Sequence, residues 1–127
     1  MHQVLVVEDD PATRHLIERL VTSERWDVAV AESGRVALER VAAQTPDLIL
    51  LDLMMPEMDG FEFVVQIQKN PAWRAIPIVV VTAKDLDASE RQRLNGHVEK
   101  ILQKGAYSHD ELFEEICQQV AVYAGRS

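Results

Sequence analysis

Short apolar runs alternate along this chain with longer amphipathic stretches. The runs cover residues 4–7, 28–31, 48–51, 76–81 and, more weakly, 98–102. Three of them are continuously apolar, which is the pattern of strands covered on both faces, as in a parallel sheet. The alternation therefore predicts a layered protein in which helices cover both faces of a sheet.

The stretches between the runs contain recognisable helix starts. Four starts carry a side chain that can cap a helix: the Asp10-Pro11 pair, Ser33 before a helix through Ala43, Asp87 with Glu90, and Ser108 with Glu111. Such side chains satisfy backbone N–H groups that the first turn leaves unpaired. A further helix is expected after Asp59-Gly60, where Gly60 is needed only if its φ is positive.

Five strands that alternate with five helices imply right-handed βαβ units. This predicts the α/β class with a doubly wound, five-stranded parallel sheet. In such sheets a site forms beyond the carboxyl ends of the strands, near the point where the winding direction reverses. The residues that follow each apolar run are therefore the candidate site residues.

Length and charge narrow the possible functions. The chain has 127 residues and a formal net charge of −8, and this length fits one domain over residues 1–127. The acidic excess opposes binding to phosphate backbones, so nucleic acid is not an expected partner. Cys117 is the only cysteine, and neither a membrane-spanning stretch nor a signal peptide is recognisable. We expect a cytoplasmic domain that makes no membrane contact.

Acidic side chains follow two of the buried runs. Glu8, Asp9 and Asp10 come after the first run, and Asp52 comes directly after the third. If these strands are neighbours, Asp9 and Asp52 converge. Unit charges about 4 Å apart repel by roughly 4 kcal/mol at an effective dielectric constant near 20, so the cluster either has raised pKa values or binds a cation. Oxygen ligands without His or Cys favour Mg²⁺, whereas Asp10 is better explained as a solvated helix cap.

The segments VLVVEDDP, LILLDLMMPEMDG and IPIVVVTAK, followed by Lys104, resemble the receiver domain of two-component response regulators. The resemblance covers nearly the whole chain in order and spacing, and it implies the flavodoxin-like (βα)5 fold of the chemotaxis regulator. It also implies that a phosphohistidine of a sensor histidine kinase or histidine phosphotransfer domain donates a phosphoryl group. The domain would then signal to a downstream protein by contact, or relay the group.

The same resemblance implies a role for each strand end. Asp52 would be the phosphoryl acceptor. The implied Mg²⁺ ligands are Glu8, Asp9, Asp52 and the backbone carbonyl of Met54. The groups implied to bind the phosphoryl oxygens are Thr82, the backbone amide of Ala83, and Lys104. The chemistry agrees, because a metal ion and an ammonium group can screen a dianionic donor and align the attack of a carboxylate.

Two positions depart from the family's usual pattern. The switch position three residues before the lysine is commonly aromatic and here is Ile101, and the proline that commonly follows the lysine through a cis peptide is here Gly105. A cis bond before glycine would cost about 2.5 to 4 kcal/mol, so we expect a trans bond, with Gly105 supplying φ freedom. Without an aromatic switch, we expect a smaller phosphorylation-induced change on the face of the last two helices.

The end of the chain bears on the output of the domain. The stretch LQKGAYSHDEL resembles receivers at the C-termini of hybrid histidine kinases, and a stand-alone regulator is the alternative. No DNA-binding or enzymatic segment follows in the sequence. We therefore expect an output by protein contact or phosphoryl relay.

Three other functions compete with this interpretation. A flavin-binding module shares the fold, but Glu8, Asp9 and Asp10 would repel a flavin phosphate. A haloacid-dehalogenase-type phosphatase needs a second acidic residue two positions after Asp52, where Met54 stands. A receiver-like domain that only binds a partner stays open, although no acceptor, metal or lysine position is missing. We expect no enzyme activity beyond autocatalysed transfer to Asp52 and slow self-dephosphorylation.

Overall fold

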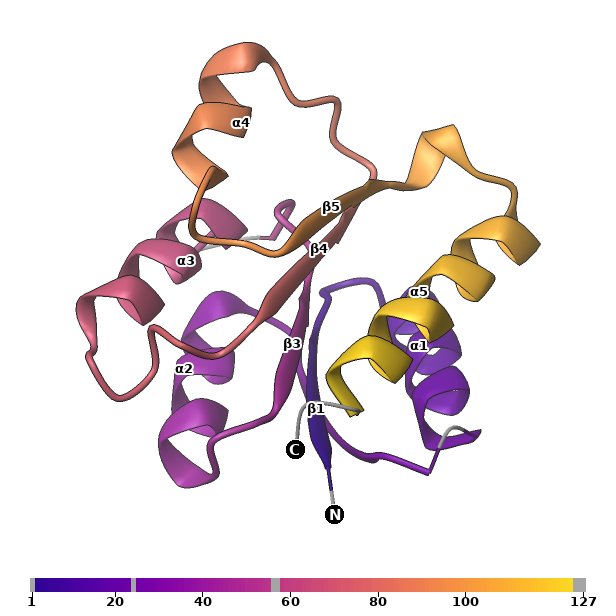
Figure 1. Cartoon of the computed structure of the whole chain (residues 1–127), viewed down its shortest axis with the longest axis horizontal. Helices are drawn as coiled ribbons and strands as arrows, with labels where there is room; N and C mark the ends of the chain where they lie inside the picture. Colours follow the sequence, from indigo (N-terminus) through magenta and orange to yellow (C-terminus); the bar gives the residue numbers. More distant parts are fainter. Residues whose placement is uncertain (1, 24, 56–57, 125–127) are drawn as a thin grey trace.

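A computed structural model describes residues 2–23, 25–55 and 58–124 of the chain. The strands are β1 (Gln3–Val7), β2 (Asp27–Ala31), β3 (Leu48–Leu51), β4 (Ile78–Thr82) and β5 (Lys100–Gln103). The helices are α1 (Pro11–Ser23), α2 (Gly34–Ala43), α3 (Gly60–Lys69), α4 (Ala88–Leu94) and α5 (His109–Ala124), with a 3-10 turn η1 (Lys104–Ala106) before α5. All neighbouring strands are parallel, in the order β2-β1-β3-β4-β5 (Figure 1). The predicted doubly wound α/β fold is confirmed.

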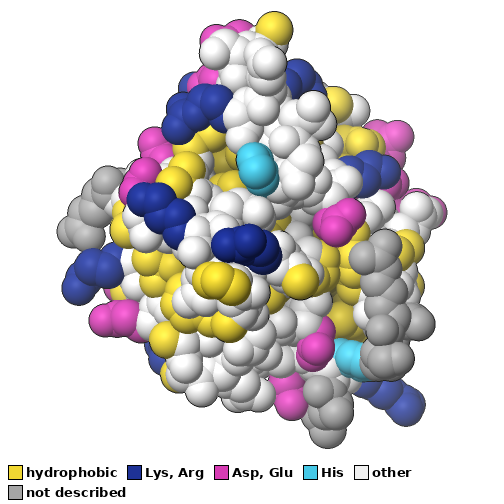
Figure 2. Space-filling view, turned by 60° about the vertical axis from the view of Figure 1, so that its left-hand side comes forward, with side chains coloured by type: hydrophobic (Ala, Val, Ile, Leu, Met, Phe, Trp, Pro, Cys, Tyr) yellow, Lys and Arg dark blue, Asp and Glu magenta, His cyan; other side chains and the backbone are white. Residues whose placement is uncertain are grey.

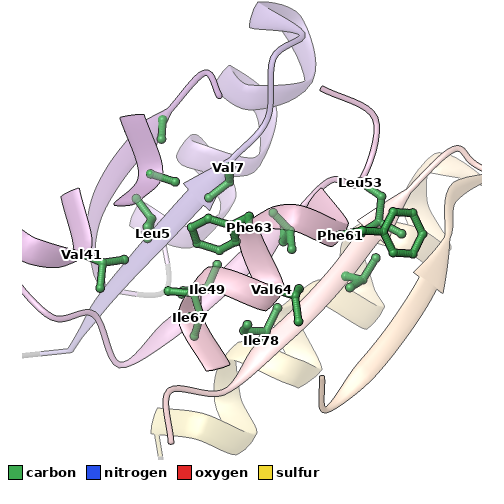
Figure 3. Close-up of a cluster of buried hydrophobic side chains, with 14 of the residues drawn as sticks. Leu5, Val7, Val41, Ile49, Leu53, Phe61, Phe63, Val64, Ile67 and Ile78 are labelled. Atoms are coloured by element: carbon green, nitrogen blue, oxygen red, sulfur yellow. The ribbon is translucent and has the colours of Figure 1, made fainter. Parts of the chain in front are cut away.

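Helices cover both faces of the sheet and create two apolar clusters. Because successive strand residues point to opposite faces, Leu5 and Val7 belong to the cluster beneath α2 and α3, whereas Val4 and Val6 belong to the cluster beneath α1 and α5. Figure 3 shows the first cluster, where the Phe63 ring of α3 lies beside Leu5 and Val7. The continuously apolar runs are thus explained by burial on both sides.

The predicted helix caps are present. Ser33 accepts a hydrogen bond from the Val36 amide. Asp59, which was not among the predicted caps, accepts one from the Glu62 amide at 2.9 Å. The remaining predicted caps are Asp10 toward Thr13, the reciprocal pair Asp87 and Glu90, and the reciprocal pair Ser108 and Glu111. These local hydrogen bonds define where the helices begin, in the segments that follow the strands.

The last two strands begin two residues later than the sequence predicts. The Ile76 amide donates to the Trp73 carbonyl in a preceding turn, and the Val98 amide donates to the Leu94 carbonyl at the end of α4. Both amides are therefore engaged before the sheet ladder starts. β4 also extends one residue further than predicted, to Thr82.

Two glycines near the site have different roles. Gly60 does not have a positive φ; instead, an added Cβ would lie 2.6 Å from the Leu53 Cα and 2.8 Å from the Asp52 carbonyl oxygen. The Lys104-Gly105 bond is trans, as predicted, but Gly105 does not use a left-handed φ, so that part of the prediction is wrong. The reason is that residues 104–106 form a 3-10 turn, whose backbone angles other residues can also adopt.

None of the described helices combines the length and apolar character needed to cross a membrane.

Candidate functional site

The carboxyl ends of β1 and β3 lie side by side at the centre of the sheet. The register pairs Val7 with Leu51, and the Asp52 amide donates to the Val7 carbonyl at 3.0 Å. This bond fixes the backbone of Asp52 against the end of β1. Carboxylate oxygens of Glu8, Asp9 and Asp52 consequently lie within 4.8 Å of one another, as the sequence predicted. β2 lies on one side of β1 and β3 lies on the other. The cluster therefore lies at the point where the winding direction of the sheet reverses.

The three carboxylates differ in burial. Glu8 is 2% exposed and Asp52 is 6% exposed, whereas Asp9 is open to solvent. The pKa of Glu8 is raised to about 8, mainly because the carboxyl group is buried. The neighbouring Asp52 also raises this pKa, and its effect exceeds the opposite effect of Lys104. Glu8 Oε2 is buried and has no hydrogen-bond partner among the described residues.

Lys104 provides the positive charge of the site. Its Nζ lies 2.8 Å from Glu8 Oε1 and 3.7 Å from Asp52 Oδ2. Lys104 does not reach Glu8 Oε2, and an unpaired carboxyl oxygen inside the protein is costly. The all-oxygen donor set therefore fits a hard divalent cation. Such a cation would also provide the missing partner of Glu8 Oε2.

The other predicted site residues surround the carboxylates. Thr82 is fully buried at the end of β4, and Ala83 follows it in an exposed loop. The Met54 amide donates to Asp52 Oδ1 at 3.1 Å, while the Met54 side chain is 53% exposed. Ile101 is half-buried in β5 and packs against the cluster beneath α2 and α3. Asp10 caps α1 and is not part of the carboxylate cluster, as predicted.

Two further side chains donate hydrogen bonds to backbone carbonyls beside the site, and the sequence pattern predicted a role for neither. Arg14 donates to the Glu8 carbonyl at 3.1 Å, and Gln103 donates to the Lys84 carbonyl at 3.0 Å. The one sequence feature that indicated that Gln103 lies near the site is its position directly before Lys104. The arrangement as a whole offers a buried carboxylate nucleophile, an adjacent ammonium group and a hydroxyl group on the neighbouring strand.

Comparisons with known proteins agree with this geometry. Residues 4–117 match the family model of the response regulator receiver domain. The chain is 39% identical over 102 residues to response regulator PleD of Caulobacter vibrioides, a match covering 80% of this chain and 22% of PleD. The chain therefore spans about a fifth of the length of that relative.

Two solved structures are similar over almost the whole chain. The N-terminal domain of a response regulator receiver protein from Methanoculleus marisnigri superposes with a TM-score of 0.76 at 34% identity, covering 91% of this chain and 94% of that chain. The receiver domain of sensor histidine kinase PA1611 from Pseudomonas aeruginosa, with a magnesium ion in its active-site cleft, superposes with a TM-score of 0.82 at 25% identity, covering 98% of each chain.

Proposed function

The chain belongs to the response regulator receiver domain family of two-component systems, and we propose that it accepts its phosphoryl group on Asp52. The observation that carries this proposal is the position of Asp52, a buried carboxylate at the end of a central strand, with Lys104 Nζ 3.7 Å away and two acidic neighbours. The proposed receiver domain fills residues 1–127.

The reaction would form one bond and break another at phosphorus. A carboxylate oxygen of Asp52 attacks, the bond from phosphorus to the donor's histidine nitrogen breaks, and the donor keeps that electron pair. Lys104 holds its ammonium charge toward the phosphoryl oxygens, and the Thr82 hydroxyl and the Ala83 amide donate hydrogen bonds to them. The role of Lys104 is supported by its short distances to both buried carboxylates.

The ion we propose is Mg²⁺, held by Glu8, Asp9, Asp52 and the backbone carbonyl of Met54. When bound, it would offset the charge of the carboxylates and of the incoming phosphoryl group. Support comes from the unpaired Glu8 Oε2 and from the three converging carboxylates.

Receiver domains of this family interact with histidine kinases and with downstream proteins. For this chain we propose a sensor histidine kinase or histidine phosphotransfer domain as the donor, and an output by protein contact in the cytoplasm, without membrane or nucleic-acid contact. The formal net charge of −8 supports the absence of nucleic-acid contact, and on the face in Figure 2 acidic side chains lie among the basic ones. We also propose that the domain is a signalling module whose own chemistry is limited to gaining and losing its phosphoryl group.

Acetyl phosphate with Mg²⁺ tests the proposal directly. Intact-protein mass spectrometry is expected to detect one added phosphoryl group in the wild type and none in Asp52→Asn. Asp10→Asn is the matched control, because it changes a carboxylate outside the cluster and asparagine also caps helices; it should be modified like the wild type. Lys104→Ala should slow the modification. Modification that persists in Asp52→Asn would assign the acceptor to another residue, and an unmodified wild type would contradict the function itself.

A further inference from the structure

The side chain of Gln103 forms hydrogen bonds with two different segments. Its Nε2 donates to the Lys84 carbonyl in the loop after β4 at 3.0 Å, and its Oε1 accepts from Arg91 Nη2 of α4 at 2.9 Å. Gln103 is the last residue of β5 and pairs with Thr82, the last residue of β4. One amide group therefore joins the loop after β4 to the middle of α4.

The bridge continues to the phosphorylation site. The Lys84 amide donates to Thr82 Oγ1 at 3.2 Å, so consecutive hydrogen-bonded groups lead from Thr82 through Lys84 and Gln103 to Arg91. The Thr82 hydroxyl accepts the bond from Lys84 and keeps its own proton to donate. A second link joins the same loop to α4, because Lys84 Nζ lies 3.1 Å from Glu90 Oε2.

Gln103 lies close to the switch position on β5. Residues two apart in a strand lie on the same face, so Gln103 lies on the same face of β5 as Ile101, the switch position. The Ile101 side chain is a hydrocarbon that can form no hydrogen bond. On this face of β5, the polar connection between the loop after β4 and α4 is therefore made by Gln103.

We propose that Gln103 is a positioning residue that couples the loop carrying Thr82 and Ala83 to α4. The inference rests on the proposed role of Thr82 in binding the phosphoryl oxygens. A phosphoryl group on Asp52 draws the Thr82 hydroxyl and the Ala83 amide toward it; the Lys84 carbonyl moves with them, and Gln103 transmits the movement to Arg91. The proposal revises the expectation drawn from Ile101: α4 responds to phosphorylation, whereas α5, which this bridge does not reach, responds little.

Amide chemical shifts test this coupling, with Mg²⁺ and beryllofluoride taking the place of the phosphoryl group. Gln103→Glu removes the donor to the Lys84 carbonyl but keeps an acceptor for Arg91. Arg91→Ala removes the contact with α4 and leaves the contact with Lys84. Gln92→Ala is the matched control, since Gln92 is an exposed α4 neighbour for which the described residues include no side-chain hydrogen bond.

In the wild type, beryllofluoride should shift amides at the site, in residues 52–54 and 82–84, and also amides of α4. Gln103→Glu and Arg91→Ala should keep the site shifts and lose roughly half or more of the α4 shifts. The double variant Gln103→Glu with Arg91→Ala should lose no more of the α4 shift changes than either single variant, because both substitutions interrupt the same path. Gln92→Ala should respond like the wild type. A residue that served only local packing would not change the α4 response selectively.

The outcomes separate this inference from the proposed function. Unchanged α4 shifts in both variants, or an α4 that does not respond in the wild type, would overturn the role of Gln103 while the site shifts upheld the proposed function. Missing site shifts in the wild type would contradict the proposed function and the inference with it. The altered contacts are partly or fully solvent-exposed, so the variants should fold. Gln103→Asn, whose shorter side chain cannot span both partners, repeats the test if Gln103→Glu does not fold.

Discussion

Glu8 is an ionisable residue whose surroundings differ greatly from water. Its carboxyl group is buried, one oxygen has no partner among the described residues, and its neighbours are the acidic Asp52 and the basic Lys104. A buried carboxylate beside another carboxylate destabilises the folded protein. This cost is consistent with the proposed metal site, because the unpaired Glu8 Oε2 is suited to binding a metal ion.

The buried Glu8 predicts an unusual pH dependence of stability. Burial, followed by the neighbouring Asp52, raises the pKa of Glu8 from 4.5 to about 8. The folded protein therefore retains a proton that the unfolded chain has lost, and this contribution to stability is full below pH 4.5 and is lost as the pH rises through about 8. In a chelating buffer, the free energy of unfolding from urea denaturation should fall across this range, by at most about 1.4 kcal/mol per pH unit from this group.

Asp52→Asn provides the matched comparison. It removes the carboxylate that helps to raise the Glu8 pKa, so the decline with pH should be shallower, and the metal-free variant should be more stable than the wild type at pH 8 by about 1 kcal/mol. Asp9→Asn, which changes an exposed carboxylate of the same cluster, should have a smaller effect. Equal slopes in wild type and Asp52→Asn would show that Asp52 does not control the protonation of Glu8.

At the scale of elements, the start of α3 is fixed by its approach to the loop after β3. The Gly60 amide donates to the Leu53 carbonyl at 3.1 Å, and Asp59 caps the helix through the Glu62 amide. Gly60 leaves no room for a Cβ because the backbone of Asp52 and Leu53 lies against it. The backbone of the proposed acceptor is thus held from one side by β1 and lies against α3 on the other.

Gly60→Ala should therefore destabilise the protein and slow its phosphorylation. An added Cβ meets backbone atoms at 2.6 Å and 2.8 Å, which cannot move without shifting Asp52. We expect a loss of about 1 to 3 kcal/mol in urea denaturation and slower modification by acetyl phosphate. Gly105→Ala is the control: nothing lies within 4 Å of its added Cβ, and its stability should stay within about 0.5 kcal/mol of the wild type. An equal loss in both variants would contradict the close-approach explanation.

At the scale of the whole molecule, the doubly wound sheet collects residues from distant parts of the chain at one edge. Glu8, Asp52, Thr82 and Lys104 each follow or end a different strand. A ligand that bridges them binds the folded chain and not the unfolded one, because the unfolded chain does not bring these groups together. Binding at this site should therefore stabilise the entire fold by mass action.

Thermal unfolding measures that stabilisation. Mg²⁺ with beryllofluoride should raise the midpoint of unfolding, with a gain of about 2.7 kcal/mol when the ligand is present at 100 times its dissociation constant. The rise in the midpoint of unfolding should be much smaller with Mg²⁺ alone. It should be smaller again in Asp52→Asn, compared with the same variant without ligand. An undiminished increment in Asp52→Asn would show that the ligand binds elsewhere.

The sequence by itself determined the features that depend on neighbouring residues. Apolar runs and capping side chains predicted the order and type of all five strands and five helices, since strand burial and helix capping leave a periodic or short-range signal. The acidic residues after two runs predicted the carboxylate cluster, because parallel strands bring their carboxyl ends to one edge.

The tertiary structure alone decided the features that depend on distances between remote segments. The burial of Glu8, the close approach of Gly60 to Asp52, and the bridge from Lys84 through Gln103 to Arg91 leave no periodic signal in the sequence. Each depends on how closely neighbouring strands and helices pack, and a few tenths of an ångström separate a contact from a gap. β4 and β5 also begin later than their apolar runs, because the Ile76 and Val98 amides are bonded in the turns that precede the strands.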